Sequence, residues 1–490
     1  MIRPLSRAAA LAGMAFLLLG LSACSTNPAT GEQSFTAFMS PEDELRVGRE
    51  QHPKILEEFG GAYDDPRLAA YVTRIGNKLG AISHRPDLNY TFTILDSPIV
   101  NAFALPGGYV YVSRGLLALA DNEAELAGVI GHEIGHVTAR HSAERYSRSV
   151  LVGLGAGVIS AVIGDAGATD LLNLGAGLYV RGYSRSQELD ADQLGLRYMM
   201  AGDYDPNAIA SFLERLRARA TLDAALNGTG GNPDGYDLLA THPRTIDRVR
   251  QAQAAVGGLR HAGRLERETY LNQLDGMLYG DNPEQGFVRG RRFVHPVLRF
   301  EFVVPPDYAL INGQTHVTAI GPDKARILFD TTSVPAGMSM RRYLGTSEWT
   351  RQLVPLTNLE VISVNGMDGA TAIARLSGST GSRDVRVVAV RADTTKIYRF
   401  IFVGPTHIMH RQQEELRRTT YSLRRLDAAE TVSLKPYRLR IHRVEPGDTV
   451  GRLAQWMPEG PDSEARFRVL NGLTLGQEPA VGQLVKYVSF

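Results

Sequence analysis

Cysteine is almost absent from this sequence, which has a single one, Cys24, among 490 residues. One cysteine cannot form a disulfide within the chain, so the fold must be stabilised by packing. An excess of charge is also missing, because 53 basic and 52 acidic side chains leave a net charge of +1. Without a basic excess there is no electrostatic reason to expect nucleic acid as a partner.

The N-terminus lacks an apolar run long enough for a membrane span, which needs about 20 residues. A shorter run covers residues 11–21, Arg3 and Arg7 precede it, and LSAC follows it and ends at Cys24. This order predicts a signal peptide over residues 1–23 and resembles the bacterial lipobox. The resemblance implies lipidation of Cys24 and, because Ser25 follows, anchoring to the outer membrane. An ordinary signal peptide with an incidental cysteine is the alternative.

The length predicts about three domains. Residues 24–40 are polar and are expected to form a tether, and residues 41–260 show helical periodicity. Within that helical region, residues 90–95 and 109–112 alternate like two short strands. Residues 149–182 are rich in glycine and alanine, which fits either close-packed core helices or a mobile flap beside an active site.

The second half of the chain changes character. Residues 261–291 are charged and are expected to form a linker. Residues 292–428 alternate as strands with turns and end in a helical pattern, which predicts a small α+β domain of unknown role. His407 and His410 in this domain lack a third partner for a metal and are interpreted as a surface pair.

Two histidines and a glutamate interrupt an apolar, helix-like run at residues 124–141. His132 and His136 are four apart, so on a helix both imidazoles can face one ion. Glu133 lies about 100° round the helix, where it can reach a water on that ion but not bind it well. This arrangement suits zinc-dependent hydrolysis, in which zinc lowers the pKa of water to about 7 and Glu133 carries the proton to the leaving amine.

A catalytic zinc needs a third protein ligand. Glu188 and Asp192 are four apart on a second amphipathic helical pattern, so Glu188 could bind the ion and Asp192 could orient a ligand histidine. A solvated acidic run is the alternative that spacing alone leaves open.

Four motifs occur in a fixed order: NAFALPGGYVYVSRGLL, ELAGVIGHEIGHVTARH, SRSQELDADQLGLRYM and THPRTIDRVR. Together they resemble the zinc metallopeptidase family that includes the CAAX prenyl endopeptidases and the bacterial beta-barrel-assembly-enhancing proteases. The resemblance covers about residues 35–255 and implies a mainly α-helical, gluzincin-type domain with a small sheet. It implies one Zn²⁺ per chain, with His132, His136 and Glu188 as ligands and Glu133 as general base. Asp192 would not bind the ion but would accept a hydrogen bond from a ligand histidine.

The same resemblance implies further roles. The strand at Asn101, Ala102 and Phe103 would pair with an extended substrate peptide. His242 would steady the oxyanion or act as an inhibitory fourth ligand, with Arg248 supporting either role. A helix-start histidine before a proline is the alternative for His242. Many relatives carry transmembrane helices or helical repeats, which this sequence lacks, and that argues against prenyl-protein processing.

Residues 437–490 resemble the LysM fold, a β-α-α-β module that binds N-acetylglucosamine polymers such as peptidoglycan. The matching residues are Val444, Gly447, Asp448, Thr449, Leu453, Ala454, Asn471, Gly472, Leu473, Gly482 and Gln483. The stretch MPEGPDSEA and the late position of Lys486 depart from the usual pattern. Glycan binding and a docking role without a ligand therefore both stay open.

The expected fold is thus a multidomain α+β protein. The expected function is a zinc endopeptidase of the bacterial periplasm, anchored to the outer membrane, that cleaves misfolded or stalled envelope proteins. The rival is a non-catalytic or autoinhibited lipoprotein that links the outer membrane to peptidoglycan. Hydrolysis of wall cross-links is less favoured, since the family acts on polypeptide backbones.

Overall fold

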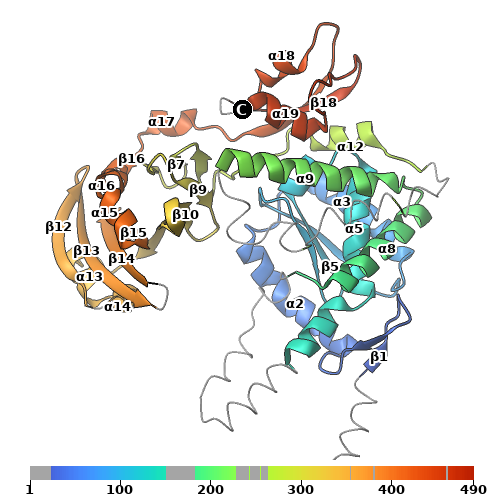
Figure 1. The fold of residues 1–490 in the computed structure, drawn as a ribbon, viewed down its shortest axis with the longest axis horizontal. Helices are drawn as coiled ribbons and strands as arrows, with labels where there is room; N and C mark the ends of the chain where they lie inside the picture. Colours follow the sequence, from blue (N-terminus) through green and yellow to red (C-terminus); the bar gives the residue numbers. More distant parts are fainter. Residues whose placement is uncertain are drawn as a thin grey trace, which may run out of the picture. The chain divides into compact units, whose positions relative to one another are not determined.

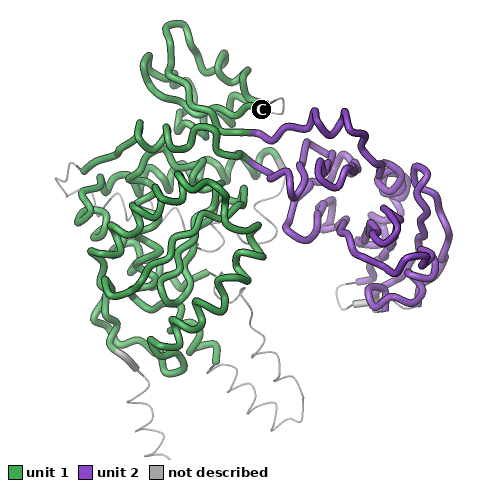
Figure 2. The backbone as a smooth tube through the Cα atoms, turned by 180° about the vertical axis from the view of Figure 1, so that it is seen from behind, with its two compact units in different colours: residues 1–279, 438–489 green, residues 280–437, 490 purple. Residues whose placement is uncertain are grey.

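The computed structural model describes residues 24–150, 182–227, 242, 254, 263–351, 353, 355–378, 381–458 and 462–490. The chain forms two compact units, the first from residues 1–279 and 438–489 and the second from residues 280–437 and 490 (Figure 2). The predicted signal peptide and nearly all of the 149–182 segment lie outside the described residues. Within the described part of the chain, no helix has the length and apolar content needed to cross a bilayer.

Unit 1 is built around helix α5 (Glu123–Thr138), all of whose residues are buried. Helices α3 (Pro66–Ala81), α8 (Arg185–Ala201) and α9 (Asn207–Asn227) pack against it, as does a three-stranded sheet (Figure 1). The sheet has the order β3-β5-β4, and its strands are β3 (Thr91–Leu95), β4 (Ala102–Leu105) and β5 (Tyr109–Ser113). The short helix α4 (Arg114–Leu119) connects β5 to α5. The two strands expected from alternation correspond to β3 and β5.

The stretch expected to be a tether, residues 24–40, is folded instead. Strand β1 (Cys24–Thr26) pairs antiparallel with β2 (Gln33–Phe35), ahead of helix α2 (Pro41–Glu58). The buried Asn27 side chain donates a hydrogen bond of 2.7 Å to the carbonyl of Ala139, just beyond the end of α5. Met39 is 2% exposed and packs in the core of unit 1. A polar composition hid these contacts because they depend on partners about a hundred residues away.

The region expected to be a linker, residues 261–291, also contains ordered elements. Helix α12 (Arg267–Leu274) buries Tyr270, Leu271 and Leu274 in unit 1, and strand β6 (Phe287–Arg289) belongs to unit 2. The prediction of a linker was wrong because one buried apolar side is enough to hold a short helix such as α12, even where most of its residues are polar or charged.

The C-terminal module packs within unit 1. It consists of β17 (Arg438–Arg443), α18 (Val450–Ala454), α19 (Ser463–Asn471) and β18 (Leu484–Ser489), with β17 antiparallel to β18. Leu439 receives a hydrogen bond of 2.9 Å from Gly276 and donates one of 2.8 Å to Met277. The chain therefore leaves unit 1 and returns to it through adjacent, hydrogen-bonded segments, and unit 2 is an insertion between them.

Unit 2 contains a seven-stranded sheet of order β12-β13-β14-β15-β11-β10-β9 and a four-stranded sheet of order β16-β8-β7-β6. In β14 (Gly381–Arg391), Val388 and Val390 enter a core with α15 (Thr406–Arg411) and α16 (Gln413–Ser422). Val385 and Val387 of the same strand enter a second core with α13 (Met340–Thr346). Alternation along β14 thus places apolar side chains in buried cores on both faces of the large sheet. The remaining strands are β7 (Arg292–His295), β8 (Phe300–Val303), β9 (Ala309–Asn312), β10 (Val317–Ile320), β11 (Arg326–Ser333), β12 (Thr357–Val364), β13 (Met367–Gly378), β15 (Lys396–Pro405) and β16 (Arg424–Arg425). The helices are η2 (Pro322–Lys324), α13 (Met340–Thr346), α14 (Glu348–Arg351), α15 (Thr406–Arg411), α16 (Gln413–Ser422) and α17 (Ala428–Ser433).

Candidate metal centre

Glycines let helices α5 and α8 approach closely at the site. A Cβ on Gly135 would lie 3.0 Å from the carbonyl oxygen of Ala191, and one on Gly195 would lie 3.0 Å from the backbone nitrogen of His132. A side chain at either position would force the helices apart. This explains why a helix-weakening glycine stands inside the histidine motif.

The N-terminus of α8 places the acidic ligand candidate. Ser184 caps the helix, and its side chain and that of Gln187 each accept a hydrogen bond from the other's backbone N–H. This capping box fixes where the helix starts. Glu188 directly follows Gln187 in the first turn of the helix and is 2% exposed. Its carboxylate is directed at the histidines of α5.

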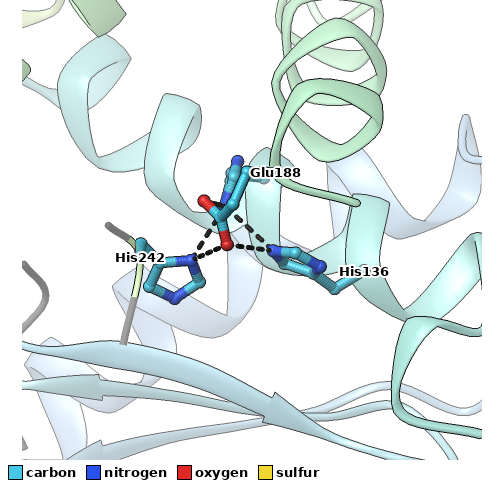
Figure 3. Close-up of side chains that lie close together, drawn as sticks. His136, Glu188 and His242 are labelled. Carbon is cyan, nitrogen blue, oxygen red and sulfur yellow. Dashed lines mark hydrogen bonds and ion pairs between the residues drawn. The ribbon is translucent and has the colours of Figure 1, made fainter. Parts of the chain in front are cut away.

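Four buried side chains from three segments of the chain, His132, His136, Glu188 and His242, converge at one point. Figure 3 labels three of them, His136, Glu188 and His242. The Nε2 atoms of His132 and His136 are 3.0 Å apart, and each lies 3.5 Å from an oxygen of Glu188. The Nδ1 atom of His242 lies 2.8 Å from Glu188 Oε1 and 3.2 Å from His132 Nε2. All four side chains are buried. The structure therefore brings together the three predicted ligands and His242.

The spacing of these atoms suits a tetrahedral cation. Zinc with ligand atoms at about 2.0–2.1 Å requires separations between ligands of about 3.3 Å. With Glu188 Oε1 as the carboxylate ligand atom, four separations run from 2.8 to 3.5 Å, and all four ligand atoms lie within 4.8 Å of one another. Imidazole and carboxylate are also ligand types that zinc accepts. Within the described ranges, this is the one group of histidine and acidic side chains arranged to hold a metal.

Electrostatics favour metal binding at this group. Burial lowers the pKa of His136 well below its ordinary value, although Glu188 opposes the shift. Burial alone would raise the pKa of the Glu188 carboxyl, but His242, His132 and His136 together hold it well below its usual range. A neutral His136 and an ionised Glu188 are the forms that bind a metal ion.

Each ligand histidine of α5 is oriented from behind. His132 Nδ1 lies 2.9 Å from Asp192 Oδ1, in the supporting position that sequence analysis gave Asp192. His136 Nδ1 lies 2.8 Å from His141 Nδ1. The ring of Tyr183 stacks on His136, with centroids 3.7 Å apart and planes 14° apart. These contacts leave Nε2 of both histidines facing the centre.

His141 and Tyr183 are the residues that sequence reasoning missed. His141 lies five positions after His136, and a helix continued that far would place it away from the ligands. Helix α5 ends at Thr138, however, and Arg140 has a left-handed φ of 55°. The chain therefore turns back and brings the His141 ring against His136. The Tyr183 contact leaves no signal in the sequence.

We expect His141→Phe to weaken zinc binding by about 10- to 100-fold, the usual effect of losing a group that orients a ligand. Burial lowers the pKa of His141 to about 3, so its neutral ring can accept the Nδ1 proton of His136. His141→Asn retains an acceptor near the same place and is the matched control, for which we expect a change of a few-fold. Zinc competition against a chromophoric chelator measures both variants, and equal affinities would contradict this role.

The other predicted residues have different surroundings. Glu133 is fully buried, with Oε1 3.5 Å from Nε2 of His242. Ala102 and Phe103 lie in β4 at the edge of its sheet, but the Phe103 ring stacks on Tyr111 in the core. Any peptide binding there must use the strand's backbone rather than that ring. Asn101 is buried just before β4, and Arg248 lies outside the described residues.

Comparison with protein families identifies the region that carries this group. Residues 66–256 match Peptidase family M48. All four members of the cluster fall inside the matched residues. The resemblance to metallopeptidases is thereby confirmed for residues 66–256, while the LysM-like resemblance stays a prediction.

Curated relatives match the same part of the chain. The mitochondrial metalloendopeptidase OMA1 of Schizosaccharomyces pombe is 31% identical over 214 residues, which cover 43% of this chain and 60% of that protein. The beta-barrel assembly-enhancing protease of Escherichia coli (strain K12) is 29% identical over 226 residues, or 44% of each chain. The chain therefore spans less than two thirds of either relative. A cyanobacterial PsbP from Synechocystis aligns with 29% of this chain and 95% of its own, at 13% identity and a TM-score of 0.24.

Proposed function

We propose that this chain is a zinc-dependent endopeptidase of the bacterial envelope that cleaves misfolded or stalled periplasmic and outer-membrane proteins. The observation that carries the proposal is the convergence of His132, His136 and Glu188 beside Glu133, inside a peptidase region. Relatives named beta-barrel assembly-enhancing protease support the envelope setting. Cys24 would anchor the chain to the outer membrane through lipid, as the lipobox-like sequence suggests.

Each residue of the site would have a separate role in hydrolysis. His132, His136 and Glu188 would hold the ion, and Asp192 and His141 keep the two imidazoles turned toward it. When bound, zinc would polarise the scissile carbonyl and make water a better nucleophile. Glu133 would take the proton of that water and deliver it to the leaving amine. The backbone of β4 would align the substrate as an added strand.

Removal of metal tests this proposal directly. We expect the purified mature chain to cleave an unfolded polypeptide such as casein, to stop after dialysis against a chelator, and to recover with about one equivalent of Zn²⁺. Cleavage is read from new peptide termini by mass spectrometry. Activity that persists without metal, or no activity at any zinc level, would contradict the proposal.

His242 supports a second candidate, an autoinhibited state of the same protein. A catalytic zinc needs three protein ligands and an open fourth position, yet His242 Nδ1 stands among the ligand atoms of this cluster. In that arrangement the chain would be a lipoprotein tether whose site is closed until His242 moves. His242→Ala distinguishes the roles: higher activity would indicate an inhibitory ligand, and lower activity would indicate a group that stabilises the transition state.

Peptidoglycan binding by residues 437–490 belongs to this proposal as a targeting function. Thr449, one of the residues that match the LysM pattern, caps helix α18. Sedimentation with purified sacculi tests binding, with release of cleaved muropeptides as the sign of the less favoured wall hydrolase. A chain that stays in the supernatant would leave the module without this role.

A further inference from the structure

A buried lysine joins the C-terminal module to the segment that leads into the metal-binding helix. Lys486 lies on β18, and its side chain is fully buried. Its ammonium donates hydrogen bonds of 2.9, 3.2 and 2.7 Å to three consecutive carbonyls, those of Ala118, Leu119 and Ala120. These carbonyls end helix α4 and lie just before the N-cap of α5, Asn122. Lys486 therefore fills the junction between the two helices.

The module itself directs this lysine. Asn471, at the end of α19, accepts a hydrogen bond of 2.7 Å from the backbone N–H of Lys486 and donates one of 2.8 Å to its carbonyl. Both backbone groups of Lys486 are thus held by one side chain of the module. A shift of α19 would move the ammonium away from the helix junction.

Charged contacts hold the same junction from two other helices. Arg267 of α12 binds both carboxylate oxygens of Asp121, at 2.7 and 3.1 Å, and donates to the carbonyl of Leu484 on β18 at 2.9 Å. Arg215 of α9 binds Glu125 in the first turn of α5 at 3.1 Å. Arg215 also packs on the module, since a Cβ on Gly472 would lie 2.3 Å from its Nη1 atom.

Packing alone does not explain a lysine at this position. Burying an ammonium group costs several kcal/mol before its partners are counted, and an apolar side chain would fill the space more cheaply. Burial lowers the pKa of Lys486 to about 7, although Asp121, 3.8 Å away, opposes the shift. Three carbonyls at a helix C-terminus are acceptors that suit a cation. Lys486 thus favours a single arrangement of the C-terminal module against the junction of α4 and α5.

That arrangement matters for the metal site because α5 is a rigid, buried helix. Glu125 and His132 are seven residues apart and therefore lie on nearly the same face, two turns from each other. Rotation or translation of the first turn would be passed to both histidines. The close contact with α8 at Gly135 leaves little room to absorb it.

We propose that Lys486 is a positioning residue for the metal-binding helix, through which the C-terminal module holds His132 and His136 in register with Glu188. The inference rests on the proposed zinc site. It makes the module part of the peptidase rather than a separately attached domain, and it gives a role to a lysine that departs from the LysM-like pattern.

The test compares Lys486→Met with Lys54→Met in the full mature chain. Methionine keeps an unbranched side chain but removes the three hydrogen bonds, and Lys54 is an exposed lysine of unit 1. At a temperature where circular dichroism shows both proteins folded, we expect Lys486→Met to weaken zinc binding roughly 2- to 30-fold, the range for residues that act through a network. The absorption spectrum of the Co²⁺-loaded protein should shift with it. Lys54→Met should match the unaltered chain.

Amide hydrogen exchange of α5 in the metal-free protein is the second readout, because it does not depend on zinc. We expect faster exchange along α5 in Lys486→Met alone. Unchanged exchange and unchanged zinc affinity in a folded variant would overturn the inference. If even the unaltered chain binds no zinc, the proposed function fails while exchange still decides the inference. If Lys486→Met does not fold, zinc affinity and amide exchange are measured on Asp121→Asn instead, which removes one charge of the junction. Unchanged values in that variant would overturn the inference.

Discussion

We expect Glu133→Gln to lower peptide-bond cleavage by about 10²–10⁴-fold, the usual contribution of a general base. Glutamine has nearly the same shape but cannot accept the proton of the attacking water. Glu133 is fully buried beside the ligand group and is not itself one of the four ligand candidates. Zinc content should therefore stay near one equivalent per chain. Rates on casein and metal analysis of the same sample measure the two quantities together.

Glu57→Gln is the matched control for this change, because Glu57 is an exposed residue of α2 in the same unit. It should cleave casein at the unaltered rate. If Glu133→Gln retained activity while holding zinc, Glu133 would not be the base, and the tether hypothesis would gain. If it lost zinc as well, the loss of activity would say nothing about proton transfer and the side chain's role would need to be reassigned.

The second large effect is expected at the acidic ligand. Glu188→Gln should weaken zinc binding by more than about 100-fold, since losing groups that only orient a ligand already costs 10- to 100-fold. The variant loses the negative charge that lies 2.8–3.5 Å from three imidazoles. An amide in its place compensates the charge of the ion poorly. Titration of the metal-free protein with Zn²⁺ in competition with a chelator gives the affinity.

Asp203→Asn serves as the control for Glu188→Gln. Asp203 lies just beyond α8, its side chain is 63% exposed, and its ion pair with Arg264 is one that contributes little at a surface. Its zinc affinity should equal that of the unaltered chain. Zinc binding by Glu188→Gln at the unaltered affinity would remove the carboxylate from the proposed ligand set.

Spacing along each helix predicts which of its side chains share a face, but the meeting of the two faces was implied only by the resemblance to metallopeptidases. Positions four apart fall on one face of α5, and Glu188 and Asp192 repeat the pattern on α8, so local geometry sets the face that each pair shares. Helical spacing does not predict the position of His141, because α5 ends before it. A backbone turn at Arg140, held by a 3.0 Å contact to Glu44, brings it back to the ligands.

Composition is a poorer guide where contacts are distant. Residues 24–40 are polar, yet Asn27 and Met39 are buried against unit 1. The LysM-like pattern describes the local course of residues 437–490, but a pattern within one module carries no information about its partner. The contacts of Lys486 join positions more than 360 residues apart, which no local periodicity reports.

The paired segments at Gly276, Met277 and Leu439 have a consequence for how such a protein could change over time. The segments that lead into and out of unit 2 lie side by side, as they do where a domain has been inserted into a turn of another domain. A domain so connected can be acquired, exchanged or lost without opening the core of the recipient. Relatives could therefore share unit 1 and carry a different domain in the place of unit 2.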